Sequence, residues 1–212
     1  MPTDHVVEQG DHISKLAEKY GFLDHRNIWD DPANASLKSL RDNPWVLFPG
    51  DLIRIPDKLL RTESVPTTKV HTFRVKLERL KLKLQIKDHE DNPIANTPVS
   101  LNVEGSVKSL TTDGEGKTER EILKTAVNGM LTVTDLEVPL KIGHLDPVDK
   151  ISGQKARLNN LGYNAGAPDG PEGPDNIQFR SAVEEFQCDQ KMKVDGVCSP
   201  ETQAKLKEVH GS

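Results

Sequence analysis

The pattern of apolar and polar positions divides the chain into three stretches of different character. Residues 1–60 have strand-like ends around apolar positions at helical spacing, which predicts a strand, helices and a closing strand. Residues 69–143 alternate with the period of β-strands over much of their length. Residues 150–212 return to helical spacing around two Asp-Gly pairs. The pattern therefore predicts a multidomain α+β protein.

Two polar segments that contain proline separate these stretches. Residues 61–68 include Pro66, and residues 144–149 include Pro147. Proline in a short polar segment favours an extended connection and disfavours a continuing helix or strand. We therefore predict linkers at these two places and three small domains, at residues 1–60, 69–143 and 150–212.

The first domain is predicted to have a βααβ order. His5–Val7 forms a short strand before a turn at Gly10, and Asp11 is the expected N-cap of the next helix. Apolar residues at helical spacing then run from Ile13 to Tyr20. The remaining expected elements are helices near residues 28–29 and 35–41 and a closing strand at residues 52–55.

Two motifs in this domain carry a family resemblance. They are Val7-x-x-Gly10-Asp11-x-Ile13-x-x-Leu16-Ala17-x-x-Tyr20-Gly21 and Leu47-x-Pro49-Gly50-Asp51-x-Ile53-x-Ile55-Pro56. Their order over residues 4–57 resembles a LysM domain. The resemblance implies binding of N-acetylglucosamine-containing glycan in a shallow groove between the first-strand loop and the loop before the last strand. The implied groove residues are Gly10, Asp11, His12, Ile13, Pro44, Val46, Leu47 and Phe48.

Some residues of these motifs also have a purely structural interpretation. Gly10 and Gly50 suit turns with positive φ, which cost little only for glycine. Trp45 lies in the second loop, where it is either a platform on which a sugar ring stacks or an aromatic residue of the core. The sequence leaves both interpretations of Trp45 open.

The middle stretch predicts an antiparallel β-sandwich. Apolar residues alternate from Phe73 to Ile86, with a register slip near Glu78–Arg79 that indicates a bulge or a break between strands. Later alternation and polar turns give six or seven short strands in all. The runs at 92–101 and 111–116 resemble transthyretin-like or carboxypeptidase-regulatory-like modules, which implies a spacer or a packing platform.

The third stretch contains an internal repeat and a second family resemblance. Asp169-Gly170 and Asp195-Gly196 are each followed by a proline and helical residues. Together with Arg157-Leu158-Asn159-Asn160-Leu161-Gly162-Tyr163 and Ala182-Val183-x-x-Phe186-Gln187, they closely resemble the three-helix peptidoglycan-binding domain over about residues 150–208. The resemblance implies four candidate contacts to peptidoglycan, each of which has a scaffold role as its alternative: Tyr163, Asp169, Gln187 and Asp195.

The chain has two cysteines, Cys188 and Cys198, on either side of the second repeat turn. An even number of cysteines in an exported module permits a disulfide that clamps this turn. Two free thiols are the alternative in a reducing compartment. Both interpretations stay open at the level of sequence.

No motif of the sequence predicts catalysis, a metal site or a cofactor. The seven histidines and two cysteines do not form a zinc-binding pattern, and no nucleophile elbow is present. Asp91, Asp113 and Glu115 do not have the spacing of a calcium loop. The adjacent Glu184 and Glu185 are typical of a solvated helix face. We therefore expect a protein that is not an enzyme.

Charge and hydropathy narrow the class of partner. Lys and Arg number 28 against 33 Asp and Glu, a net charge of −5 that disfavours nucleic acid. The longest apolar runs, such as Trp45–Phe48, are too short to span a membrane. Residues 1–7 lack the basic and apolar segments of a Sec signal, so we expect synthesis in the cytoplasm and action at the cell wall or periplasm only after export by another route.

Two wall-binding modules on one chain would bind with avidity if the spacer lets both reach the same sacculus. The order of the three modules resembles that of accessory proteins found with type VI secretion spikes and related contractile injection systems. We therefore expect a non-catalytic peptidoglycan-binding accessory protein that associates with spike or effector proteins. The alternatives are a wall anchor that regulates a separate hydrolase, and a cytosolic adaptor or chaperone that uses these folds for protein contacts.

Overall fold

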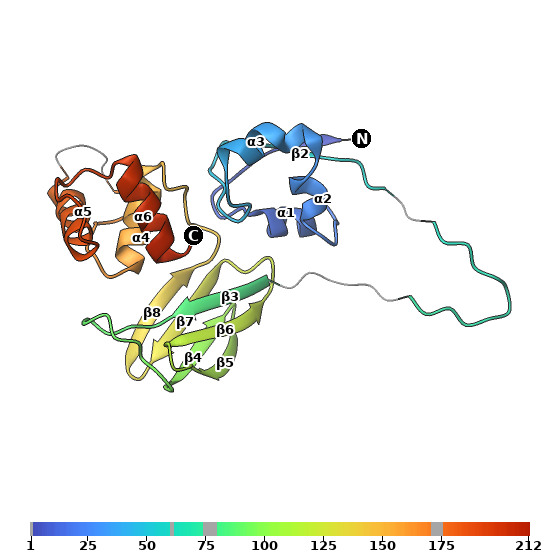
Figure 1. Cartoon of the computed structure of the whole chain (residues 1–212). Helices are drawn as coiled ribbons and strands as arrows, with labels where there is room; N and C mark the ends of the chain where they lie inside the picture. The colour runs from blue at the N-terminus through green and yellow to red at the C-terminus, as the bar shows by residue number, and fades with distance from the viewer. Residues whose placement is uncertain (1, 60–61, 74–79, 171–175) are drawn as a thin grey trace. The chain divides into compact units, whose positions relative to one another are not determined.

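The computed structural model describes residues 2–59, 62–73, 80–170 and 176–212 (Figure 1). The chain divides into two compact units, one of residues 1–45 and 49–143 and one of residues 46–48 and 144–212. The first unit contains an α/β region and a region of antiparallel sheets, and the second contains three helices. The predicted α+β class is therefore confirmed.

The α/β region begins and ends with the two strands of a small antiparallel sheet. Strand β1 (Thr3–Val6) pairs with β2 (Leu52–Ile55), with Val6 opposite Leu52. Between the strands lie α1 (Ile13–Lys19), α2 (Arg26–Trp29), the 3-10 helix η1 (Pro32–Asn34) and α3 (Ala35–Leu40). The predicted order of strand, helices and strand is confirmed, with η1 as an additional short turn before α3.

The core of this region follows the helical spacing of its apolar residues. Ile13 and Leu16 on one face of α1 are fully buried, as is Ile53 of β2. A buried amide then connects the helices to the sheet: the Asn34 Oδ1 atom accepts the Arg54 N–H at 2.7 Å, and its Nδ2 donates to the Arg54 carbonyl oxygen at 2.7 Å. Asn34 thus takes the place of a neighbouring strand along one side of β2.

The outer face of the β1–β2 sheet is partly apolar. Val6 and Leu52, which are cross-strand partners, are 57% and 59% exposed. The next pair on this face is charged, and Arg54 Nη1 donates to Asp4 Oδ1 at 2.8 Å. Exposed cross-strand pairs of both kinds therefore lie side by side on four-residue strands.

The expected N-cap of α1 is wrong by one residue. His12, not Asp11, is the N-cap, and its Nδ1 accepts the Lys15 N–H at 3.4 Å. The Asp11 carboxylate instead accepts the Glu8 N–H at 3.1 Å and lies 3.0 Å from His5 Nε2. The carboxylate is held by the preceding turn and strand, so the next side chain caps the helix.

The middle region is an antiparallel β-sandwich, as predicted. One sheet pairs β3 (Leu80–Gln85) with β6 (Lys117–Ile122), and the other has the order β5-β4-β7-β8. The strands of the larger sheet are β4 (Pro98–Val103), β5 (Ser106–Thr111), β7 (Asn128–Val133) and β8 (Leu136–Lys141). Buried Val99, Leu101 and Val103 of β4 pack with Leu82 and Leu84 of β3, so the two sheets share one core.

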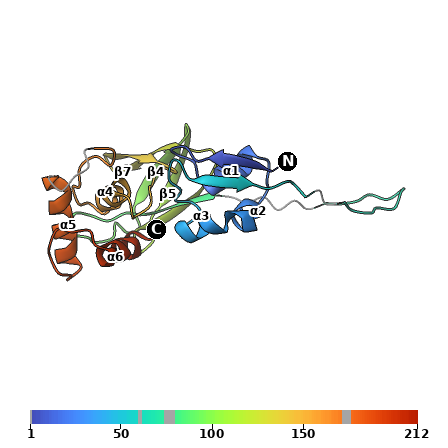
Figure 2. The same ribbon diagram turned by 90° about the horizontal axis from the view of Figure 1, so that it is seen from above.

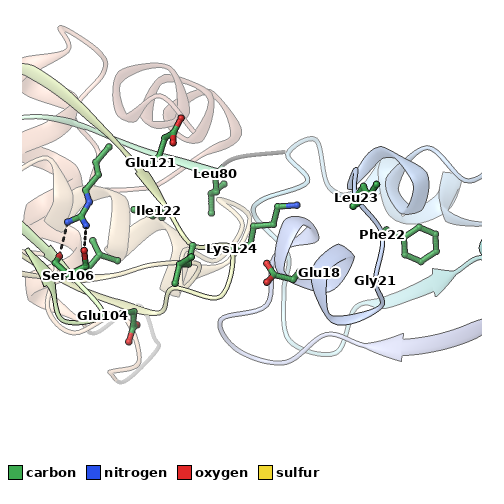
Figure 3. A pocket seen from close by; sticks show the side chains of 13 residues that line it. Glu18, Gly21, Phe22, Leu23, Leu80, Glu104, Ser106, Glu121, Ile122 and Lys124 are labelled. Carbon is green, nitrogen blue, oxygen red and sulfur yellow. Dashed lines mark hydrogen bonds between the residues drawn. The ribbon is translucent and has the colours of Figure 1, made fainter. Parts of the chain in front are cut away.

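A buried arginine joins the two sheets at one end of the sandwich. Arg120 of β6 is 9% exposed, and its guanidinium donates to the carbonyl oxygens of Leu101 and Ser106. Its Nη2 also donates to Ser106 Oγ at 2.8 Å, and Figure 3 draws the hydrogen bonds at Ser106 as dashed lines. Carbonyl acceptors satisfy this cation inside the sandwich, which explains an arginine at an inward position of a strand.

The predicted alternation before β3 is only partly described. Strand β3 begins at Leu80, and Phe73 lies outside any strand and is 65% exposed. The predicted register slip at Glu78–Arg79 falls within residues 74–79, which lie outside the described residues. Within the described residues the sandwich has six strands, in agreement with the lower of the predicted numbers.

The second unit contains α4 (Ile151–Asn160), α5 (Ile177–Asp189) and α6 (Pro200–His210) (Figures 1 and 2). Apolar residues at helical spacing meet in one core, which includes the fully buried Phe186 and Leu206. Ser199 caps α6 by accepting the Thr202 N–H, and Pro200 occupies the first turn, where its missing N–H costs nothing. No helix of the described residues is long and apolar enough to cross a membrane.

Candidate functional site

The predicted groove of the α/β region is formed by two loops that are hydrogen-bonded to each other. The Ile13 N–H, at the start of α1, donates to the Pro44 carbonyl oxygen at 3.2 Å. Gly10 has a φ of +85° in the first loop, and its carbonyl oxygen accepts from Lys15 Nζ at 3.1 Å. The structure thus joins the first-strand loop to the loop before β2 at Pro44.

Most of the predicted groove residues are buried. Asp11, His12, Ile13, Val46 and Leu47 are each less than 9% exposed. Backbone and apolar packing therefore account for much of the motif. A ligand at this place would meet the outer rim of the loops and their half-buried members.

A polar network fixes the first loop from inside. Tyr20 Oη lies 3.0 Å from His5 Nδ1, and His5 Nε2 lies 3.0 Å from Asp11 Oδ2. Lys15 Nζ is 3.1 Å from Asp11 Oδ1. Burial would raise the pKa of Asp11, but the hydrogen bonds from His5, from the Glu8 N–H and from Lys15 outweigh it and hold this pKa below its usual value. Asp11 therefore acts as a structural anion.

Trp45 is the exposed aromatic residue of the second loop. Its side chain is 42% exposed, whereas Trp29 of α2 is 6% exposed and belongs to the core. Trp45 Nε1 donates to Ser14 Oγ at 3.1 Å, and the His25 ring lies 5.2 Å from the indole ring between centroids. Of the two interpretations of Trp45, its exposure contradicts the core aromatic.

In the helical unit, Gln187 holds the second repeat turn. Its Oε1 accepts the N–H groups of Asp195 and Gly196, both at 3.0 Å. Its Nε2 lies 3.0–3.2 Å from three acceptors, and the side chain is 2% exposed. The Gln187 side chain is therefore committed to the scaffold. The second repeat turn is defined here as residues 194–197.

The Asp195 side chain lies at the surface of this turn. Its Oδ1 accepts from Gln187 Nε2 and from the Val197 N–H, each at 3.0 Å. The hydrogen bond from Gln187 is the main cause that lowers the pKa of Asp195 below its ordinary value, and the Val197 N–H adds to it. Asp195 therefore keeps an anionic carboxylate on an exposed turn, and its Oδ1 accepts two hydrogen bonds from the scaffold.

The first repeat turn, residues 165–170, is held by different residues. Asn159 Oδ1 accepts the Ala165 N–H at 2.9 Å, and its Nδ2 donates to the Gly166 carbonyl oxygen at 2.8 Å. The ammonium group of Lys155, on a side chain that is 1% exposed, lies 3.3 Å from the Gly170 carbonyl oxygen. Asp169 itself is exposed. The sequence motif does not predict these contacts of Asn159 and Lys155, because the partners are backbone groups.

Tyr163 precedes the first turn and packs against α5. Its hydroxyl group donates to Asp189 Oδ2 at 2.9 Å, and its ring meets Phe186 edge to face with centroids 5.7 Å apart. The ring is half-buried against the core. Tyr163 and Asp169 are therefore the predicted contact residues of this unit, besides Asp195, that reach its surface.

Arg157 is a buried charged residue whose contacts the sequence motif does not predict. Arg157 is 2% exposed, and its Nη1 donates to the carbonyl oxygens of Asp146 at 2.7 Å and Gly153 at 2.9 Å. Burial lowers the pKa of Arg157 to about 10. Burial of the His210 ring and the positive charge of Arg157 lower the pKa of His210 to about 4, so this histidine is neutral at pH 7. These groups fasten the ends of α4 and α6.

Both cysteines are free thiols, which contradicts the optional disulfide. Cys188 is exposed on α5, whereas Cys198 is half-buried and packs against the helical core. Burial raises the pKa of the Cys198 thiol to about 12. The second repeat turn is clamped by the Gln187 amide instead of a covalent bond.

The comparisons with known proteins agree with the helical unit. The family model described as "Putative peptidoglycan binding domain" matches residues 150–206, about a quarter of the chain. No curated protein and no solved structure matches the chain. The match includes α4, α5, most of α6 and both repeat turns. Residues 150–206 are thus similar to a putative peptidoglycan-binding domain.

Proposed function

We propose that this protein is a non-catalytic accessory protein that binds peptidoglycan through residues 150–206 and supports this binding with the α/β region. The observation that carries the proposal is the family match, together with the apolar core that the described residues of α4, α5 and α6 share. Peptidoglycan combines glycan strands with short peptides, and the surface of this domain offers an anionic turn and an aromatic ring edge to such a polymer.

The LysM resemblance supplies the second part of the proposal. The α/β region has the implied order of elements, and its two loops are joined by the Ile13–Pro44 hydrogen bond. Binding of N-acetylglucosamine-containing glycan at the rim of these loops would give the chain two weak sites. Two weak sites on one chain bind a polymer more tightly than either does alone, if the connection lets both reach it.

The non-catalytic role is supported by the hydrogen bonds of the polar clusters, which hold loops and helix ends in place. The His5–Asp11–Tyr20 network lies inside the α/β region, and Arg157 and Gln187 are spent on backbone groups. Each cluster stabilises a loop or a helix end. We propose further that the chain accompanies the spike of a type VI secretion system or a related contractile machine, which the order of its three regions resembles.

Sedimentation with insoluble peptidoglycan sacculi tests the proposed function. We expect the full chain to sediment with sacculi, and an inert protein of similar net charge to remain in solution. Phe186→Ser, which removes a fully buried ring from the helical core, should abolish most of the retention. Glu185→Ala changes an exposed residue next to Phe186 on α5, outside the candidate contacts, and should sediment like the full chain.

Equal retention of the full chain and of Phe186→Ser would contradict binding through residues 150–206. The association with a spike needs a separate test, because sacculi do not report on it. Copurification of the tagged full chain with a spike protein from the producing cells would support it. Retention on sacculi without any spike protein would favour the alternative of a wall anchor.

A further inference from the structure

The four-stranded sheet of the β-sandwich has an outer face that carries almost no charge. Strands β4, β5, β7 and β8 (Figure 1) contribute residues to the sandwich core, and the residues that alternate with these point outward. On β4, β5 and β7 the outward residues are serine, threonine, asparagine, proline, valine and methionine. Although 29% of the chain is charged, the charged outward residues of these four described strands are Glu137 and Lys141 of β8 alone. Depletion of charged residues is typical of the centre of a protein–protein interface.

The outer face of the other sheet of the sandwich has the opposite character. In β3 and β6 the outward residues are Lys81, Lys83, Gln85, Lys117, Glu119 and Glu121. All of them except Gln85 are charged, and Lys81 Nζ lies 2.6 Å from Glu119 Oε1. Low charge is therefore a property of the four-stranded sheet and not of the whole domain. We call the outward residues of β4, β5, β7 and β8 the low-charge face.

A row of mostly apolar residues crosses the middle of the low-charge face. Val107, Asn102, Met130 and Pro139 are successive cross-strand partners from β5 to β8, and we call them the central row. Val107 is 65% exposed, Pro139 is exposed and Met130 is half-buried. The next row consists of two serines, a threonine and Glu137. Short side chains beside the central row leave the face flat, which suits packing against another sheet.

The two charged residues of β8 lie symmetrically about the central row. Glu137 and Lys141 are two residues before and two residues after Pro139, so they are about 14 Å apart along one strand and do not pair within a copy. Their cross-strand partners are the uncharged Thr132 and Asn128. A two-fold axis along the central row would place Glu137 of each copy opposite Lys141 of the other. The charge pattern of β8 is therefore complementary to itself.

We infer that the low-charge face is a self-association surface, on which two copies of this chain pack face to face around a two-fold axis along the central row. Wall binding plays no part in this association, which is therefore independent of the proposed function. At the usual strand spacings the face covers about 400 Å² in each copy, about half of what each partner buries in a standard interface. We therefore expect a weak dimer with a Kd of roughly 10–100 µM.

Sedimentation velocity of the full chain over a range of concentrations measures this dimer. Met130→Arg brings like charges together at the axis and should weaken the dimer at least about tenfold. Val107→Arg makes the same change at a position that is 65% exposed, where the risk to folding is least. Gln85→Arg adds the same charge to the outer face of β3 and is the matched control, which should dimerise like the full chain.

A charge exchange on β8 tests the two-fold arrangement itself. Glu137→Lys and Lys141→Glu each place like charges opposite each other in the two copies, so each should weaken the dimer about threefold to tenfold. The double variant restores opposite charges between the copies and should recover most of the original affinity. Recovery in the double variant would report a contact between copies, because the two residues are too far apart to pair within one.

Three results would overturn the proposed dimer. The first is a full chain that remains monomeric at about 500 µM, well above the expected Kd. The second is a dimer that neither Met130→Arg nor Val107→Arg weakens while thermal unfolding shows both variants folded; another surface, such as the uncovered edge of β5, would then hold the copies together. The third is a double exchange that dimerises as weakly as the single variants. Retention on sacculi tests the proposed function separately in each case.

Discussion

The two repeat turns of the helical unit share a sequence pattern but are held by different chemistry. The second turn depends on Gln187, one buried amide whose two ends bond to both sides of the turn. The first turn depends on exposed Asn159 and on the buried ammonium group of Lys155, which lies 3.3–3.4 Å from its carbonyl partners. An internal repeat in sequence therefore does not guarantee that corresponding residues do the same work.

Removal of the Gln187 amide should have the largest effect on the stability of the helical unit. Gln187→Ala leaves the part-buried N–H groups of Asp195 and Gly196 without their acceptor and opens a small cavity at a buried side chain, so we expect a loss of about 2–3 kcal/mol in the stability of this unit. Hydrogen–deuterium exchange of residues 150–212 in the full chain would measure it.

The matched control for this variant is Gln203→Ala. Its Nε2 donates one hydrogen bond, to the Cys198 carbonyl oxygen at 2.9 Å, so its loss should cost about 1 kcal/mol. Equal exchange in the two glutamine variants would show that the clamp around Gln187 contributes no more than a single hydrogen bond.

Lys155 should matter less to the first turn. Lys155→Met removes two long hydrogen bonds but also relieves the cost of a buried charge, so we expect a loss of about 1–2 kcal/mol. Exchange of the amides in residues 165–170 is the measurement. Lys205→Met on α6, which breaks only a surface pair with Glu208, should change stability by less than about 0.5 kcal/mol. A loss in Lys155→Met as large as that of Gln187→Ala would reverse the proposed ranking.

Asn159 should have a smaller effect still. Its side chain is exposed, so water can replace both of its hydrogen bonds to the turn when Asn159→Ala removes them. We expect a loss of about 0.5–1 kcal/mol, confined to faster exchange at Ala165 and Gly166. Asn164→Ala, an exposed residue next to the turn, is the control. A loss of several kcal/mol would show that the first turn relies on Asn159 as strongly as the second relies on Gln187.

The titration of Asp195 reports on the hydrogen bonds of the second repeat turn and requires no mutation in the native protein. Hydrogen bonds from Gln187 and the Val197 N–H lower its pKa in the folded protein. Its contribution to stability is therefore present above its unfolded pKa, about 3.9, and is lost as the pH falls through the lower folded value. Carbon NMR of the Asp195 carboxyl group should show a titration below the ordinary range, which moves upward in Gln187→Ala. An unchanged midpoint in that variant would remove Gln187 as the main cause.

Much of the fold was predictable because it depends on periodicity. The apolar positions of α1 and α5 and the alternation of β4 place their own elements, and the family motifs locate the two loops and the two turns. The N-cap was predicted at Asp11 but lies at His12, because a tertiary contact with His5 captured the carboxylate. Local sequence cannot show such competition.

The candidate site was less predictable, for the same physical reason. The motif predicts Gln187 as a contact to peptidoglycan. In the structure its Oε1 accepts hydrogen bonds from a turn eight and nine residues away in sequence. Lys155 and Arg157 are charged residues that the fold buries by offering carbonyl acceptors. The exposure of Trp45 likewise depends on where Ser14 and His25 lie, which no spacing rule contains.

The two-stranded β1–β2 sheet has a consequence for behaviour at high concentration. Each strand has a side that the other does not cover, and a strand with unpaired backbone groups can recruit a strand of another copy. Asn34 occupies backbone groups of β2 at Arg54, and the Asp4–Arg54 pair places charge beside exposed Val6 and Leu52. Short length and the Asn34 amide therefore leave fewer β2 backbone groups open to a strand of another copy, which opposes edge-to-edge pairing at this strand.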